Sequence, residues 1–173
     1  MTIPRAVWIA MASAIAVVPG AVAQSSEPAD ATCPVTITNG LGLKRSVGES
    51  PAGNHGNDSR TLATALCSDG TVTFKPGGPG CIDDEGGMSM KLPWWYEGTH
   101  KHLVIEGRRL DGDAPPLRAR IPGGYSGGFQ ASALSFPTPG CWQVTGKVDG
   151  QSLTFVVRAV KIGDGPPRCR PRR

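Results

Sequence analysis

The sequence predicts an all-β domain of about seven to eight strands. Short runs of alternating apolar and polar residues recur along the chain, and clusters of turn-forming residues separate them. The 173 residues include 24 Gly and 16 Pro, yet 39% of all residues are apolar, which favours many ordered turns around a core. No segment beyond residue 23 shows an apolar period of 3.6 residues, so helices are not expected. These three observations indicate a β-sandwich or a β-barrel.

The first 23 residues have the features of a secretory signal peptide. Arg5 supplies the positive charge, residues 6–18 are apolar but short for a membrane span, and Ala-Val-Ala at residues 21–23 forms a cleavage motif. Residues 24–31 are polar and predict a flexible leader. We therefore expect an exported protein, secreted or periplasmic, that has no membrane span after signal removal.

The first half of the domain holds four expected strands. The segment CPVTITNG alternates apolar and polar residues and ends in Asn-Gly, which is typical of a strand closing in a turn. Residues 41–60 lack a sustained pattern and predict a long surface loop. Ser-Asp-Gly at residues 68–70 predicts a hairpin between the strands on either side of it. The expected strands are Cys33 to Gly40, Thr61 to Cys67, Thr71 to Lys75 and Met88 to Leu92.

The second half carries the clearest alternation. Asp149-Gly150 is a strong hairpin signal between two long strands. The domain is expected to cover residues 32–163, followed by a basic Pro/Arg tail at residues 164–173. Earlier strands are expected at His102 to Leu110, Leu117 to Ile121 and Phe129 to Phe136. One face of the first long strand is formed by Trp142, Val144, Gly146 and Val148. One face of the second is formed by Leu153, Phe155, Val157 and Ala159.

The end of the domain resembles the end of immunoglobulin-like domains. There a G-x-Y-x-C or G-x-Y-x-V element opens the penultimate strand, and the matching residues here are Gly140, Trp142 and Val144. Cys141 points to the face opposite Trp142, so the disulfide inside the core of such domains is not reproduced in its usual place. The resemblance implies an immunoglobulin-like β-sandwich.

A longer stretch resembles a group of secreted bacterial proteins of unknown function. Phe129 to Gly146 reads FQASALSFPTPGCWQVTG, and the group also carries D-G-T-V-x-F-x-P-G-G-P-G, K-x-P-W-W and E-G-R-R-L-D elements. Here those elements are Asp69 to Gly80, Lys91 to Trp95 and Glu106 to Asp111. The resemblance covers most of residues 33–163. It implies an exported single domain and no activity.

Five cysteines follow the signal segment, and an exported chain favours disulfides. Cys67 and Cys81 bracket a hairpin-like segment, so a local bridge between them is expected. Cys33 and Cys141 would then form a long-range bridge from the first strand to a late one. Cys169 is left over, either as a free thiol or as a link between chains; we otherwise expect a monomer.

The net charge of +4 arises from the chain ends. Without Arg5 and the four arginines among the last six residues, the body is nearly neutral. Such a tail can touch nucleic acid, anionic lipid or an acidic glycan, but a frayed, solvated terminus is the expected state. The basic run Arg108-Arg109, together with Arg118 and Arg120, could form a patch. Glu106, Asp111 and Asp113 lie beside the run, so mutual compensation is expected rather than nucleic-acid binding.

The segment GGYSGGF around Ser126 fits the G-x-S-x-G pattern of serine hydrolases. The three histidines, His55, His100 and His102, all precede Ser126, so an order with a later His fails. The chain order of His, Asp and Ser found in chymotrypsin-type proteases is present. His55, however, has no apolar strand beside it in the sequence, which argues against a catalytic role. We therefore expect a protein that is not an enzyme, and we interpret the segment as a Gly-rich connection whose aromatic residues, Tyr125 and Phe129, matter through packing.

Two pairs of residues suit copper. Met88 and Met90 place two thioethers on one face of a strand, and His100 and His102 do the same for two imidazoles. Exported sandwich domains serve as copper carriers, and the end of this chain also resembles such carriers. Since Met also fills irregular gaps in cores, the pairs need to converge for this hypothesis to hold.

Two further clusters each have a functional and a purely structural interpretation. The aromatic run Trp94, Trp95 and Tyr96 would offer a binding surface if one ring were exposed, or would simply pack at the sandwich edge. The acidic run Asp83-Asp84-Glu85 could hold calcium, but it lacks the alternating spacing of the commonest loop, and a solvated turn is expected.

These observations leave two function hypotheses. The first is a non-enzymatic immunoglobulin-like module that binds a protein or an envelope component of unknown identity, with no cofactor. The alternative is a periplasmic copper carrier that uses the Met and His pairs.

Overall fold

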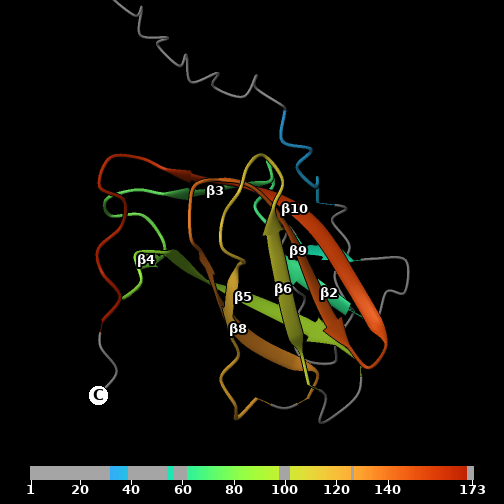
Figure 1. Ribbon diagram of the computed structural model, residues 1–173. Helices are drawn as coiled ribbons and strands as arrows, with labels where there is room; N and C mark the ends of the chain where they lie inside the picture. Colours follow the sequence, from blue (N-terminus) through green and yellow to red (C-terminus); the bar gives the residue numbers. More distant parts are fainter. Residues whose placement is uncertain (1–31, 39–53, 57–61, 98–101, 126, 171–173) are drawn as a thin grey trace, which may run out of the picture.

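The computed structural model describes residues 32–38, 54–56, 62–97, 102–125 and 127–170. The described residues form no helix, and their strands build two sheets that pack face to face (Figure 1). The predicted all-β sandwich is therefore confirmed. The strands are β1 (Asn54–Gly56), β2 (Leu62–Ala65), β3 (Thr71–Phe74), β4 (Cys81–Ile82), β5 (Met88–Tyr96), β6 (Val104–Arg109), β7 (Arg118–Arg120), β8 (Phe129–Phe136), β9 (Gly140–Val148) and β10 (Gln151–Lys161).

The order of the strands is immunoglobulin-like. One sheet has the order β1-β2-β5-β8-β7, with β4 also paired to β5, and the other has the order β3-β10-β9-β6. The run β2-β5-β8-β7 corresponds to strands A-B-E-D of an immunoglobulin domain, and β10-β9-β6 corresponds to G-F-C. We call these the ABED sheet and the GFC sheet.

The final hairpin forms as the sequence predicts. β9 and β10 are antiparallel from Gln151 paired with Val148 to Ala159 paired with Gly140. Asp149 and Gly150 both have positive φ, at 46° and 76°, which is the backbone of a two-residue turn that follows the twist of the strands. The expected inward faces of both strands are buried in the core.

The predicted hairpin at residues 68–70 is wrong. β2 belongs to the ABED sheet, whereas β3 pairs in parallel with β10 in the GFC sheet. The turn therefore carries the chain from one sheet to the other. Gly70 has a φ of 67°, and a Cβ there would lie 2.5 Å from Cβ of Val35, so glycine is required both by the turn and by the segment packed on it.

Two predictions near the N-terminus also need correction. Residues 33–38 form no strand; Thr36 makes a single backbone bond to Val156, and its hydroxyl accepts the N–H of Val156 in place of a second backbone carbonyl. The expected loop at residues 41–60 contains β1, which pairs with β2.

The strand expected at residues 88–92 continues through Pro93 to Tyr96. Pro93 lies opposite Ala131 in the middle of the β5–β8 ladder. Its carbonyl accepts a hydrogen bond from the Thr64 hydroxyl of β2. The Thr64 hydroxyl thus satisfies the carbonyl of a residue that has no N–H to give to the ladder.

The disulfides confirm one predicted pair and overturn the other. Cys33 is bonded to Cys141, as expected. Cys81 is bonded to Cys169, not to Cys67, and Cys67 is the free cysteine of the described residues. Because β2 and β3 diverge into different sheets, the segment between Cys67 and Cys81 is not a hairpin that would bring its ends together.

The prediction of a frayed tail at residues 164–173 is wrong for the part of the tail that the structure describes. The N–H of Ile82 donates to Pro167, and the N–H of Cys169 donates back to Ile82. These bonds and the Cys81–Cys169 disulfide hold the C-terminal segment beside β4 (Figure 1).

Candidate functional site: an apolar cavity between the sheets

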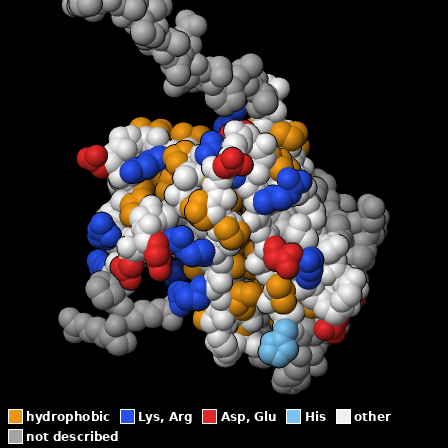
Figure 2. All heavy atoms as spheres, viewed as in Figure 1, with side chains coloured by type: hydrophobic (Ala, Val, Ile, Leu, Met, Phe, Trp, Pro, Cys, Tyr) orange, Lys and Arg blue, Asp and Glu red, His pale blue; other side chains and the backbone are white. Residues whose placement is uncertain are grey.

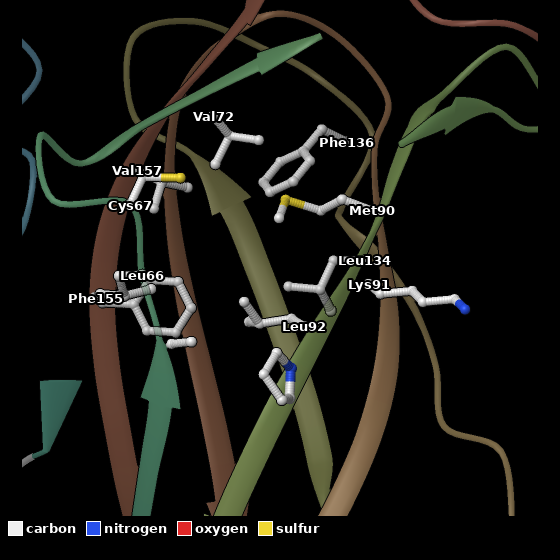
Figure 3. A pocket seen from close by; sticks show the side chains of 12 residues that line it. Leu66, Cys67, Val72, Met90, Lys91, Leu92, Leu134, Phe136, Phe155 and Val157 are labelled. Carbon is white, nitrogen blue, oxygen red and sulfur yellow. The ribbon is translucent and has the colours of Figure 1, made fainter. Parts of the chain in front are cut away.

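A cavity of about 240 Å³ lies between the two sheets (Figure 3). β5 and β8 form one wall and β10 forms the other, while β3 and the end of the β2 segment border it along one edge. Nearly all of the lining is aliphatic, aromatic or thioether carbon and sulfur. The lining residues are Ala65, Leu66, Cys67, Val72, Met90, Lys91, Leu92, Pro93, Leu134, Phe136, Phe155 and Val157.

The alternation of the strands creates this lining. Met90 and Leu92 project inward from β5, and Figure 3 shows the thioether of Met90 directed toward Phe136. Phe155 and Val157 project inward from β10. The space lies beside the segment where the chain leaves the ABED sheet for the GFC sheet, so no continuous strand closes the sandwich at that edge.

Two ionisable residues border the cavity. Cys67 is exposed, yet partial burial of its thiol, together with the negative charge of Asp69, raises the pKa of Cys67. The thiol is therefore protonated at neutral pH and behaves as a small apolar group. Lys91 lines the rim with its stem, and its ammonium points away from the cavity (Figure 3).

Of the four residues expected to bind copper, the structure describes Met88, Met90 and His102. Met88 is buried in the core and Met90 faces the cavity. Met90 is four residues before Trp94, roughly 13 Å along the strand. His102 is exposed and precedes β6. Trp94 packs on Gly146, which pairs with Ile105 of β6, so His102 lies beyond Trp94 from Met90. His100 lies outside the described residues.

The described residues contain no group of three or more His, Cys, Asp and Glu side chains that could hold a metal ion. The acidic run instead forms a turn around an ion pair. Arg118 donates to Asp83 at 2.6 Å, and Glu85 lies 3.5 Å from the same nitrogen. This agrees with the expected solvated acidic turn.

The aromatic run, which would offer a binding surface if one ring were exposed, is buried. Trp94 is fully enclosed, and Trp95 and Tyr96 are 9% and 7% exposed. Trp95 packs on Phe129, which in turn packs on Tyr125 with a centroid distance of 5.3 Å. The aromatic residues that flank Ser126 therefore act through packing, as expected, while Ser126 itself lies outside the described residues.

Charged side chains are interspersed on the surface (Figure 2). Arg109 pairs with Asp111 at 2.7 Å, and Lys147 pairs with Glu106 at 2.7 Å. The expected compensation of the basic run at Arg108 and Arg109 is thus present at Arg109. Within the described ranges, no helix is long and apolar enough to cross a membrane.

No protein-family model matches the chain, and no curated protein matches it. Among solved structures, the chain is similar to the X-ray structure of a "Putative Lipoprotein from Bacillus anthracis", at 17% identity and a TM-score of 0.35. The similarity covers 61% of this chain and 76% of that chain. A similarity at this TM-score identifies neither a shared fold nor a shared function.

Proposed function

We propose that this chain is an exported, non-enzymatic immunoglobulin-like module that binds a small apolar ligand in the inter-sheet cavity. The apolar lining of a cavity of about 240 Å³ is the observation that carries the proposal. Water inside such a space finds few hydrogen-bond partners, so an apolar guest is favoured over solvent.

The volume limits the size of the ligand. Apolar cavities of roughly 150 Å³ are large enough for benzene. Sites that enclose drug-sized ligands measure about 300–1,000 Å³. The cavity lies between these limits and therefore suits a single ring, a short alkyl chain, or the apolar end of a larger molecule.

Export is supported by covalent chemistry. Two disulfides link Cys33 with Cys141 and Cys81 with Cys169, and such bonds persist in oxidising compartments outside the cytosol. The secretory features of residues 1–23 and the resemblance to secreted bacterial proteins support the same location.

The proposal is tested by methyl NMR of the mature chain titrated with toluene and with 1-octanol. We expect saturable shifts at the methyl groups of Val72, Leu134 and Val157, which line the cavity. The methyl groups of Val148 and Leu153 are buried elsewhere in the core and should move much less. Absence of saturable shifts at the lining methyl groups with both probes would overturn the proposal.

A matched pair of variants separates the cavity from general surface binding. Val72→Phe should fill the cavity and abolish the shifts. Val104→Phe introduces the same ring at an exposed position of β6, where the valine is 48% exposed, and should leave the shifts intact. Equal binding by both folded variants would place the ligand elsewhere.

A further inference from the structure

A second hollow, of about 360 Å³, lies on the outer face of the ABED sheet. We call it the outer hollow. It is polar, in contrast to the inter-sheet cavity, and it lies on the opposite side of the same strands. Its lining residues are Asp83, Asp84, Glu85, Ser89, Arg118, Ala119, Arg120, Ala133, Ser135, Cys169 and Arg170.

Small side chains form the floor of the outer hollow. The strand register aligns Ser89 of β5, Ser135 of β8 and Arg118 of β7 in one row, with Ala133 and Arg120 in the next row. Side chains at every second residue of a strand share a face, so these residues all project outward. Serine and alanine between longer arginines leave the depression open.

The C-terminal segment forms another wall. The Cys81–Cys169 disulfide and the backbone bonds of Ile82 fix this segment beside β4. They hold Arg170 at the hollow, although Arg170 is within four residues of the chain end. Figure 2 shows basic and acidic side chains gathered together on the β4 side of the molecule.

The charges around the hollow are unequally compensated. Partial burial opposes ionisation of Asp83, but hydrogen bonds from Arg118, Ser135 and Gly87 outweigh it and lower the pKa of Asp83. Asp83 and Glu85 thus neutralise Arg118. Arg120 and Arg170 have no ion pair with any residue that the structure describes.

Lys91 adds a further positive charge beside the floor. The register places it opposite Ala133, which in turn lies opposite Arg120. Two strand spacings separate Lys91 from Arg120, roughly 10 Å. An anionic group above Ala133 would therefore have cations on both sides, while the hydroxyl of Ser89 and the carboxylate of Asp84 could meet hydroxyl groups of the same ligand.

We propose that the outer hollow binds a small hydroxylated acid, namely a sugar-sized molecule with one carboxylate or one phosphate group. Arg120, Arg170 and Lys91 hold the anion. The serine floor and Asp84 contact the hydroxyl groups. This site is independent of the inter-sheet cavity.

Calorimetric titration of the mature protein at low ionic strength tests the site with glucuronate, glucose 6-phosphate and glucose. We expect saturable binding of one or both acids and none of glucose. The two acids also show whether a carboxylate or a phosphate is preferred. If neither acid binds, or if glucose binds equally well, the proposal is overturned.

Variants distinguish a shaped site from a diffuse positive surface. Ala133→Leu fills the floor without changing any charge and should weaken binding at least tenfold. Ala131→Leu is the matched control, since Ala131 is on the same face of β8 and is also half-buried, but it does not line the hollow. Equal binding by the two variants would overturn the proposal. Arg120→Gln should also weaken binding, whereas Lys161→Gln should not.

Discussion

Trp94 of the ABED sheet packs directly on Gly146 of the GFC sheet. A Cβ at Gly146 would collide with the six-membered ring of Trp94. The indole N–H donates to Ser132 at 3.1 Å, and the Ser132 hydroxyl donates to the carbonyl of Leu92 at 2.9 Å. In antibody domains a disulfide joins strands B and F; here β5 and β9, which correspond to B and F, are joined by this aromatic contact.

Gly146→Ala should destabilise the fold by about 1–3 kcal/mol, because Trp94 has no space to retreat in a filled core. The free energy of unfolding in urea measures this change. Gly123→Ala is the control, since nothing lies within 4 Å of a Cβ at that position. Equal stabilities of the two variants would show that the contact is not tight.

Ser132→Ala should cost about 1–3 kcal/mol, because it leaves the buried N–H of Trp94 without an acceptor. Denaturant unfolding checks this value. Ser152→Ala, at an exposed position of β10, should change stability by less than about 0.5 kcal/mol. A cost at position 132 no larger than that would mean that the indole finds another acceptor.

Val157→Leu should be neutral or stabilising, because the added methylene enters the inter-sheet cavity. Val144→Leu makes the same change at a fully buried position of β9 outside the cavity lining. It should overpack the core and cost about 1–3 kcal/mol. Thermal unfolding compares the two variants, and equal losses would argue that the cavity is not open to an extra methylene.

The native and the denatured chain should each show one reactive thiol per molecule in the absence of reductant, because only Cys67 is free among the described cysteines. Cys169→Ser should lower stability by about 2–5 kcal/mol, since the Cys81–Cys169 bond closes a loop with a sequence separation of 88 residues. Cys67→Ser should have little effect. Thiol titration and non-reducing peptide mapping check the pairing, and a peptide that links Cys67 with Cys81 would contradict it.

Acid should weaken the fold through Asp83. Its pKa is lowered in the folded state, so its contribution to stability is complete above its ordinary pKa of about 3.8 and is lost as pH falls through that value toward the folded pKa. Urea unfolding between pH 2 and 6 should show this loss, and Arg118→Gln should reduce it. Lys161→Gln is the control. It removes an exposed cation from the other sheet and should leave the pH profile unchanged.

The fold class and the final hairpin could be predicted because their signals are local. Asp149-Gly150 requires a turn, and alternation on either side of it determines the buried face. The pairing of Cys33 with Cys141 was also predicted. In contrast, Ser68-Asp69-Gly70 signals a turn but not the partner of the strand that follows it, and β3 pairs with β10, which is distant in the sequence.

The candidate site could not be predicted for the same reason. The inter-sheet cavity depends on where β3 settles relative to β5 and β10, and no local pattern encodes that spacing. The bridge of Cys169 depends on the path of a tail whose composition suggests fraying. One signal was available: Ala131, Ala133 and Ser135 make the outer face of β8 unusually small, and a depression is to be expected there.

The two disulfides also determine how the domain responds to a pulling force. Each joins a residue near one end of the described chain to a strand, Cys33 to β9 and Cys169 to β4. Tension between Cys33 and Cys169 passes through the bond to Cys141 and then along the chain from Cys141 to Cys169. Cys81 moves with Cys169, so residues 33–81 and 81–141 bear the same tension in parallel. The shortest of the three segments, residues 141–169 with β9 and β10, therefore limits how far the domain can be extended.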